Sequence, residues 1–304
     1  MRRTLCSFFA AAGFCSAALA QQPPPDVIVE TVSVAPGVYM LVGRGGNVGL
    51  TVGADGAAII DDQFDDMAGK LRAAVALISD RPVKFVINTH LHGDHTGGND
   101  AFGRAGAVII AQENVRKRLG TAQVNPSTQA QIPPRAREAL PVITFADSAT
   151  LHFNDDDLQF THVPNAHTET DIIVRFRKAN VVHMGDCFTA GFPFIDRNTG
   201  GSIDGLIKAH ETVLAGIDDS TRLIRGHGPL GNKAELQAYH DMLVTVRERI
   251  VRLVKSGKTQ EEVVAARPTR EFEEKYAGAS FNAANWIGGL YTELKEVLRR
   301  GKRG

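Results

Sequence analysis

The sequence predicts an α/β fold in which helices flank two β-sheets within one domain. Three observations support this prediction. Short β-branched runs separated by turn residues fill the first part of the chain, helical periodicity alternates with buried strands in the middle, and the last quarter is helical. Since no internal repeat or low-complexity linker interrupts the sequence, we expect residues 21–304 to form a single domain, of which about 232–304 is a helical C-terminal extension.

The first twenty residues predict a secretory signal peptide. Arg2 and Arg3 precede an apolar run that ends in the small-residue pattern Ala18-Leu19-Ala20. Cleavage after Ala20 leaves a mature chain without an apolar stretch long enough to cross a bilayer. We therefore expect an exported protein, periplasmic or secreted, without a stable membrane anchor. Retention of the N-terminal segment as an anchor is the alternative.

Charge and cysteine content limit the classes of partner and the sources of stability. Lysine plus arginine and aspartate plus glutamate each number 34, so no excess of positive charge suggests nucleic acid as a partner. Cys187 is the one cysteine that remains after the expected cleavage, so no intrachain disulfide can form. Stability must come from an apolar core, for which 43% hydrophobic residues suffice.

The first strands and the first helix follow from local patterns. Residues 27–60 predict an antiparallel meander, because β-branched runs alternate with the turn segments APG, GRGGN and GADG. Residues 67–79 predict a helix with Asp65 and Asp66 in its first turn, where carboxylates suit the helix dipole. The near-continuous apolar run over residues 83–89 predicts a buried strand.

The rest of the chain repeats this alternation and then turns helical. Seven further strands are expected, together with two helices and a proline-rich loop near residues 131–141. The expected strands are 107–111, 141–145, 149–153, 158–163, 172–177, 180–185 and 221–226, and the expected helices are 113–120 and 202–214. The C-terminal helices are predicted over 232–257, 259–266 and 285–300, and Thr259 with Glu262 forms a capping box for the middle one.

Three histidines and an aspartate lie within six residues, directly after the predicted strand 83–89. Alternate residues of an extended strand end point to the same side, so His90 and His92 can bind one metal ion. Gly93 frees the backbone to turn, which places Asp94 and His95 where they suit a second ion nearby. The segment therefore predicts a pair of metal ions. The alternative is a group of surface or capping residues before a helix that starts near Thr96.

Three later residues are candidate ligands because each lies in a loop at the end of a predicted strand, where sites are usually assembled. They are His167 in VPNAHTETD, Asp186 in VVHMGDCF and His227 in IRGHGPL. Taken singly, each also has a plain interpretation: a turn histidine, a helix-capping aspartate and a glycine-flanked loop histidine.

The segment THLHGDH resembles the HxHxDH signature of the metallo-β-lactamase superfamily, and AHTETD, HMGDCF and RGHGP resemble its later motifs in the same order. The resemblance covers about residues 30–230. It implies a four-layer αββα sandwich with the site along one edge of the two sheets. It also implies the ligand sets: His90, His92 and His167 for a first zinc ion, Asp94, His95 and His227 for a second, and Asp186 bridging both.

Two departures from the zinc β-lactamases of this family are relevant to activity. Many of those enzymes place a cysteine where Asp186 falls, whereas Cys187 comes one position later and is expected to be a small buried residue. They also often carry a lysine shortly after that cysteine to bind the substrate carboxylate. Here no basic residue lies between Cys187 and Arg197. The bridging aspartate resembles the glyoxalase II and lactonase branches instead.

These observations favour an exported di-zinc hydrolase. Imidazole and carboxylate ligands suit zinc first, with iron or manganese as alternatives. We expect metal-bound hydroxide, oriented by Asp94 as the catalytic residue, to cleave a C–O, C–N or C–S bond of a small carbonyl substrate: a β-lactam, lactone, ester or thioester. A binding or interaction protein of the same fold without efficient turnover is the alternative.

Weaker predictions concern the surroundings of the site and the C-terminal helices. Asp61, Thr89 and His183 could orient ligands, although Asp61 could equally cap the following helix and His183 could simply pack in its strand. Arg44 and Asn47 in the GRGGN turn are candidate substrate contacts, with a plain glycine hairpin as the alternative. The apolar stripe of the C-terminal helices could pack on the sandwich or mediate a homodimer.

Overall fold

The structure is a computed structural model that describes residues 27–124, 129–278 and 282–301. The predicted signal peptide lies outside these residues. Among the helices described, none is long and apolar enough to cross a membrane.

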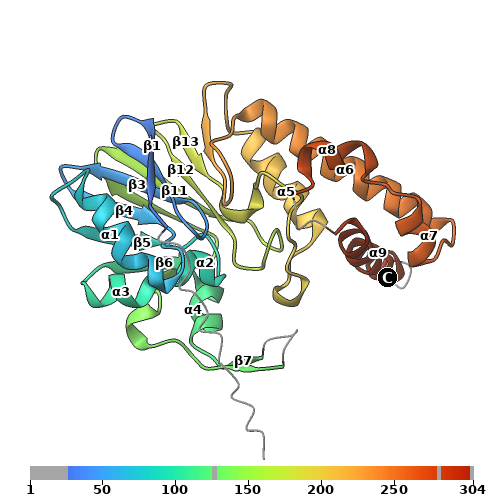
Figure 1. The fold of residues 1–304 in the computed structure, drawn as a ribbon, viewed down its shortest axis with the longest axis horizontal. Coiled ribbons are helices and arrows are strands. Elements are labelled where there is room, and N and C mark those ends of the chain that lie inside the picture. The colour runs from blue at the N-terminus through green and yellow to red at the C-terminus, as the bar shows by residue number, and fades with distance from the viewer. Residues whose placement is uncertain (1–26, 125–128, 279–281, 302–304) are drawn as a thin grey trace, which may run out of the picture.

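Two β-sheets form the centre of the fold (Figure 1). The larger sheet has the strand order β1-β2-β3-β4-β5-β6-β9, antiparallel from β1 to β4 and parallel from β4 onward. Its strands are β1 Glu30–Ala35, β2 Val38–Val42, β3 Val48–Gly53, β4 Gly56–Ile60, β5 Val83–Ile87, β6 Val108–Gln112 and β9 Ile143–Phe145. The predicted meander is confirmed, and the strand predicted over residues 83–89 is present as β5, of which Val86 and Ile87 are buried and Lys84 is exposed.

The smaller sheet has the order β10-β11-β12-β13-β14, and its last pair, β13 with β14, is parallel. Its strands are β10 Ser148–Phe153, β11 Asp156–His162, β12 Ile172–Phe176, β13 Val181–His183 and β14 Arg222–Ile224. A separate two-stranded hairpin, β7 Gln123–Val124 with β8 Gln131–Ile132, projects from the larger-sheet half. The sequence did not predict this hairpin, since two-residue strands are too short to show an alternating pattern.

Helices cover the outer face of each sheet. The helices of the larger-sheet half are α1 Ala68–Ala76, α2 Gly93–Thr96, α3 Asn99–Arg104 and α4 Glu113–Leu119, and those of the other half are α5 Ile203–Leu214 and α6 Lys233–Lys255. Leu71 of α1 and Phe102 of α3 pack with Leu50 and Ile59 of the larger sheet. On the other side, Leu206 of α5 belongs to the same apolar cluster as residues of the smaller sheet.

The two inner sheet faces bury a common apolar core. Ile60 and Ile87 of the larger sheet pack there with Phe160, Val174 and Ile224 of the smaller one. Each such side chain contributes about 1.5–3 kcal/mol to folding by leaving water. Helices, sheet, sheet and helices therefore form four layers, and the αββα sandwich predicted from the sequence is confirmed.

The prediction for the start of the first helix is wrong. Asp65 and Asp66 do not begin α1 but form a separate 3-10 turn, Asp65–Met67, ahead of it. Further 3-10 turns lie at Arg137–Ala139, Gly185–Cys187, Arg197–Thr199 and Arg270–Phe272. The six-residue helix α3 was not predicted, because so short a segment shows less than two turns of periodicity.

The C-terminal extension consists of α6, α7 Gln260–Ala265, α8 Glu273–Tyr276 and α9 Ala283–Arg300, and its last helices stand beside the sandwich (Figure 1). The predicted capping box of Thr259 and Glu262 is confirmed at the start of α7. Ile287, Leu290 and Leu294 of α9 are buried in the cluster that also contains residues of α5 and α6. The apolar stripe of α9 thus packs within the chain.

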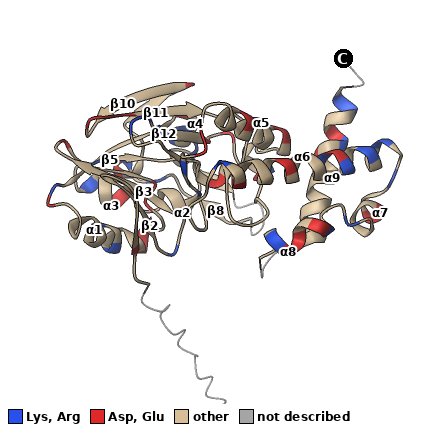
Figure 2. Ribbon diagram, turned by 90° about the horizontal axis from the view of Figure 1, so that it is seen from above, with Lys and Arg blue, Asp and Glu red and all other residues tan. Residues whose placement is uncertain are grey.

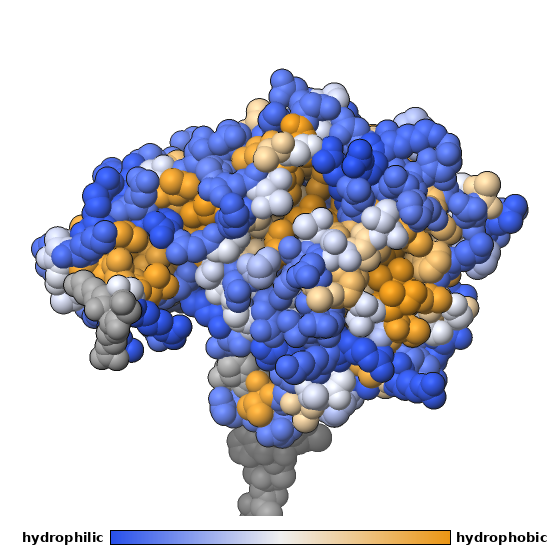
Figure 3. Space-filling model, turned by 180° about the vertical axis from the view of Figure 1, so that it is seen from behind, coloured by the Kyte–Doolittle hydropathy of each residue, from blue (hydrophilic) through white to orange (hydrophobic). Residues whose placement is uncertain are grey.

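The surface of the extension is mixed in character. Figure 2 shows acidic and basic residues interspersed along the ribbon of α6 to α9. On the face in Figure 3, apolar atoms form several patches separated by polar ones, and one patch lies on the C-terminal helices. Val297 of α9 is 46% exposed. A homodimer through these helices remains a prediction.

His210 of α5 makes the stability of the fold sensitive to acid. It is fully buried, and its Nε2 donates to the carbonyl oxygen of Cys187 at 2.5 Å. Burial lowers the pKa of His210 to about 4, against the raising effect of the Cys187 carbonyl and with a further lowering by His240. The unfolded chain takes up this proton near the ordinary pKa, so stability is complete above about pH 6.5 and is lost as the pH falls towards 4.

Between pH 7 and pH 5 the unchanged protein should therefore lose about 2 kcal/mol more of its unfolding free energy than His210→Gln loses. Urea unfolding of both metal-free proteins at the two pH values measures this difference. Equal losses in the two proteins would contradict the role assigned to His210.

Candidate metal centre

The seven predicted ligands come together at one edge of the sandwich. His90 and His92 follow β5, Asp94 and His95 lie in α2, and the other three come from the smaller-sheet half. Those three are His167 in the loop after β11, Asp186 in the turn after β13 and His227 after β14. Because α2 begins at Gly93 and His92 makes no side-chain capping bond, these residues do not cap a helix near Thr96.

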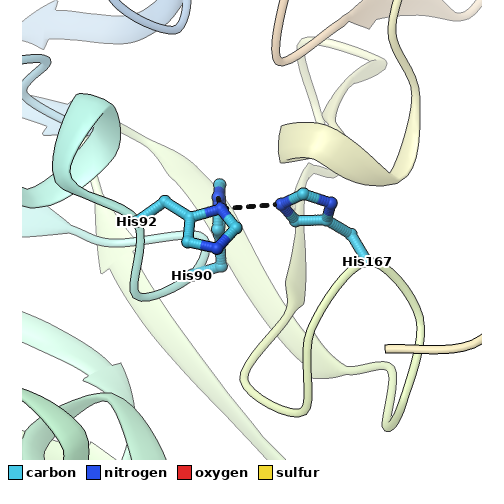
Figure 4. A group of neighbouring side chains, drawn as sticks. All are labelled: His90, His92 and His167. Carbon is cyan, nitrogen blue, oxygen red and sulfur yellow. Dashed lines mark hydrogen bonds between the residues drawn. The ribbon is translucent and has the colours of Figure 1, made fainter. Parts of the chain in front are cut away.

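The first ligand cluster consists of three imidazoles that converge on one point (Figure 4). His92 Nδ1 lies 3.2 Å from His90 Nε2 and 2.9 Å from His167 Nε2. His90 and His167 are fully or almost fully buried, whereas 21% of the His92 side chain is exposed. Asp186 Oδ2 approaches this cluster at 3.6 Å from His167 Nε2.

The second cluster lies directly beside the first. His227 Nε2 is 3.2 Å from Asp94 Oδ2, and His95 Nε2 is 3.7 Å from the same oxygen. Asp186 Oδ1 lies 3.2 Å from His95 Nε2 and 3.4 Å from His227 Nε2. Asp186 therefore presents one carboxylate oxygen to each cluster, which is the arrangement of a bridging ligand.

The donor atoms fit a pair of metal ions. His95 Nε2 and Asp186 Oδ1 are buried and have no hydrogen-bond partner of acceptable geometry among the described residues. Buried polar atoms are normally paired, and a cation between these two would satisfy both. Five imidazoles with two carboxylates and no thiolate form a donor set that suits zinc.

The two clusters differ in protonation when no metal is bound. Burial lowers the pKa of His90 well below its ordinary value, and it lowers the pKa of His167 to about 4 despite the opposing effect of Asp186. Burial acts in the same sense on His227, but its bonds to Asp186 and Asp94 outweigh it and raise the pKa to about 9. For His95, Asp186 and Asp61 likewise overcome burial and raise the pKa.

Zinc binding should consequently release protons from the second cluster. Near pH 7.5 His95 and His227 carry protons that must leave before their Nε2 atoms can bind metal, and above about pH 9 the contribution of His227 disappears. Titration calorimetry of zinc into metal-free protein, in buffers of different ionisation enthalpy, measures this release. A release that is absent at pH 7.5, or that grows with pH, would show that the assigned protonation is wrong.

Asp61 orients a ligand in each cluster. Its Oδ2 accepts from His95 Nδ1 at 2.7 Å and from Thr89 Oγ1 at 2.7 Å, and Thr89 Oγ1 in turn lies 3.0 Å from His90 Nδ1. Such contacts fix the tautomer that leaves the opposite ring nitrogen free for metal. Asp61 is fully buried and has a φ of 66°, an unusual conformation for an aspartate. Of the two roles predicted for Asp61, the structure supports the first: Asp61 orients ligands, and the cap of the following turn is Phe64.

Two further orienting groups come from the loop 189–196 and were not predicted. Asp196 Oδ2 lies 3.0 Å from His92 Nε2, and the Phe194 carbonyl accepts from His167 Nδ1 at 2.6 Å. Burial acts to raise the pKa of Asp196, but bonds to His92 and Thr199 lower it to about 2, so it is a carboxylate at neutral pH. Asp196 could have been suspected from its place after FTAGFPFI, whereas a backbone carbonyl leaves no signal in a sequence.

These contacts distinguish the roles of two aspartates. Asp61→Asn should weaken zinc binding at both clusters by about 10–100-fold, whereas Asp196→Asn should weaken it at the first cluster alone. Competition with a chromogenic chelator, followed by the spectrum of the cobalt-substituted protein, separates the two sites. If Asp196→Asn weakened both sites equally, or Asp61→Asn neither, the assignment would fail.

The prediction that Asn47 contacts a substrate needs correction, and the nearby His183 and Cys187 are packed, buried residues. Asn47 is buried, and its Nδ2 donates to the carbonyls of Arg225 and Gly228 at 2.9 and 2.7 Å, so it holds the turn that carries His227 instead of facing a substrate. His183 packs in β13 with Nε2 at 3.1 Å from the Asn47 carbonyl. Cys187 is buried, and its sulfur belongs to neither of the two ligand clusters.

Arg44 remains a predicted contact at the rim of the site. Its guanidinium pairs with Asp66 and lies 4.8 Å from the ring centre of Phe64. Phe64 lines a cavity of about 660 Å³ in front of the metal centre. The other lining residues are His92, Gly93, Asp94, Asp186, Thr189, Ala190, Gly191, Phe192, Phe194, His227 and Gly228.

Comparison with known proteins places this arrangement in context. A family model described as the metallo-beta-lactamase superfamily matches residues 41–227, more than half of the chain. A metallo-beta-lactamase from Pontibacter korlensis is 16% identical, with a TM-score of 0.58 over 71% of this chain and 98% of that one. The mono-zinc form of FIM-1 from Pseudomonas aeruginosa is also 16% identical, with a TM-score of 0.57 over 72% of this chain and 96% of that one.

A third similar structure reaches further along the chain. A double mutant of the sec-alkyl sulfatase PisA1 is 18% identical, with a TM-score of 0.66 over 87% of this chain and 50% of that one. Since 87% of 304 residues is more than the 231 residues before the C-terminal extension, part of the extension must be matched as well. At these identities the likeness concerns the fold alone.

Proposed function

Because the chain belongs to the metallo-beta-lactamase superfamily, we propose that it is a di-zinc hydrolase of a small carbonyl substrate: a lactone, ester, thioester or β-lactam. The observation that carries the proposal is Asp186, which offers Oδ2 to the first cluster and Oδ1 to the second. A single-metal site or a simple histidine cluster would not need a buried carboxylate turned to both sides.

The residues of the centre would divide the work. His90, His92 and His167 would hold one zinc ion, Asp94, His95 and His227 the other, and Asp186 both. Bound zinc would supply a water of lowered pKa as the nucleophile and would polarise the carbonyl group under attack. The contacts of Asp61, Asp196 and the Phe194 carbonyl would keep the imidazole nitrogens aimed at the metals.

Asp94 is the best candidate for moving a proton. Its side chain is 25% exposed and lines the cavity, whereas the bridging Asp186 is 11% exposed. Although burial acts to raise the pKa of Asp94, bonds and charges of His227 and His95 lower it, so the group is a carboxylate that can accept a proton. The Asp94 carboxylate would take a proton from the attacking water and deliver it to the leaving group.

The cavity favours an uncharged, apolar group beside the scissile bond. Phe64, Phe192 and Phe194 supply its walls, and Phe194 is 65% exposed. Among the described residues, no lysine or arginine lines this cavity. A β-lactam carboxylate would therefore find no cation there, which ranks lactones, esters and thioesters ahead of β-lactams.

Hydrolysis of a sulfate ester is the second candidate. It is favoured by one observation: the sec-alkyl sulfatase matches part of the C-terminal extension in addition to the sandwich. A carbonyl substrate and an alkyl sulfate would place different groups at the metals, so a substrate panel separates them.

The panel tests the zinc-loaded mature protein with an aryl ester, a lactone, a thioester, a chromogenic cephalosporin and a secondary alkyl sulfate. We expect turnover of an ester, lactone or thioester, reduced at least about 100-fold in Asp94→Asn. Zinc content is measured alongside, because Asp94 is also a proposed ligand. A protein that binds two zinc ions and turns over none of these substrates would favour the binding-protein alternative, and turnover of the alkyl sulfate alone would favour the sulfatase.

We also propose that the protein is exported. The proposal is based on the positively charged start, the apolar run and the Ala18-Leu19-Ala20 pattern of the N-terminal segment. N-terminal sequencing of protein from the native compartment would support it by finding Gln21 first and would contradict it by finding an intact Met1.

A further inference from the structure

A second cleft opens on the other side of His92. It measures about 430 Å³ and lies between α4, the β7–β8 hairpin and the turn at Arg197–Thr199. Figure 1 shows the hairpin next to α4. His92 and Gly93 line both this cleft and the cavity in front of the metal centre, so the two spaces meet at these residues.

Arg135 brings a positive charge to the junction of the two spaces. A Cβ atom added to Gly93 would lie 3.9 Å from Arg135 Nη2, so the guanidinium sits against the turn that precedes Asp94. Arg135 is exposed, no hydrogen bond or ion pair of its side chain occurs within the described ranges, and its charge acts on the buried carboxyl group of Asp62, whose pKa it lowers against the larger raising effect of burial. The second arginine of the cleft, Arg118, is instead engaged with Glu169 at 2.6 Å.

Part of the cleft wall is apolar. Leu91 and Leu119 contribute from the sandwich side, and Val124 and Ile132 contribute from the hairpin. Val124 is 49% and Ile132 44% exposed, so both side chains remain in contact with water when the cleft is empty of ligand. Exposed apolar side chains around an available guanidinium suit a ligand that has an apolar body and an anionic end.

The charged side chains around the cleft favour Arg135 as the binding group for an anion. Asp196 lines the same cleft but is bonded to His92, and Asp94 lies next to Gly93 within the metal centre. Neither carboxylate can bind an anion, and with Arg118 paired to Glu169 the remaining cationic groups are Arg135 and the bound zinc ions. A carboxylate at the outer end of a substrate is therefore best placed against Arg135, whose planar fork can donate two parallel hydrogen bonds.

We infer that Arg135 binds the carboxylate of the substrate, with the apolar body of that substrate along the β7–β8 hairpin and its scissile bond at the metal centre. The inference rests on the proposed hydrolase function. It makes Arg135 a specificity-determining residue: it recognises an amphipathic monocarboxylate from a cleft that is distinct from the aromatic cavity.

A binding experiment tests the inference without turnover. The zinc-loaded protein is titrated with 4-phenylbutanoate and with its neutral analogue 4-phenylbutan-1-ol. We expect the carboxylate to bind about tenfold more tightly than the alcohol, and Arg135→Gln to remove that preference. Arg137→Gln is the matched control, because it removes a nearby exposed arginine that does not line the cleft. A preference that persists in Arg135→Gln, as direct binding of the carboxylate to zinc would produce, overturns the inference.

A kinetic experiment tests the same residue during hydrolysis. Monophenyl succinate and phenyl butanoate share a leaving group and differ in a terminal carboxylate. We expect Arg135→Gln to lower kcat/KM about tenfold for the charged ester and to leave the neutral ester unchanged, with partial rescue in Arg135→Lys. Equal effects on the two esters would overturn the inference while hydrolysis stands. Absence of all hydrolysis would contradict the proposed function alone, since the binding experiment decides the role of Arg135.

Discussion

The carboxylate of Asp186 is the contact on which the rest of the site depends. It lies where β13 and β14 run parallel, and its two oxygens face two different groups of imidazoles. The backbone is packed closely to hold it there: Gly226 donates to the Gly185 carbonyl at 2.8 Å, and a Cβ on Gly226 would lie 2.0 Å from Asp186 Oδ1. Only glycine fits at position 226, because any side chain would displace the carboxylate.

The C-terminal extension holds the loop 189–196 that orients two ligands of this centre. Trp286 Nε1 donates to the Pro193 carbonyl at 2.7 Å, and the Phe192 amide donates to the Tyr276 carbonyl at 2.9 Å. These bonds hold the loop 189–196, whose Phe194 carbonyl and Asp196 carboxylate orient two of the three histidines of the first cluster. The helices beyond the matched family region are thereby connected to the metal ligands through one loop.

The candidate ligands could be found from the sequence because they lie in four segments, THLHGDH, AHTETD, HMGDCF and RGHGP, that resemble the motifs of the metallo-β-lactamase superfamily in the same order. The sandwich was likewise readable, since its strands and long helices carry strong periodicity. Asn47 was predicted as a substrate contact from its place in the GRGGN turn, whereas the structure buries it and uses its amide to hold the turn of His227. The role of the Phe194 carbonyl could not be predicted, because a backbone carbonyl leaves no signal in a sequence. The position of Arg135 could not be predicted either, because a hairpin of two-residue strands and a proline-rich loop give no pattern that fixes their approach to Gly93.

The central claim is a two-metal centre bridged by Asp186, and the most direct test is the zinc content of the purified mature protein beside that of Asp186→Asn. Elemental analysis after zinc loading and removal of free metal should give two zinc ions per chain in the unchanged protein and fewer in the variant. One zinc ion or none in the unchanged protein, or two in both proteins, would contradict the account.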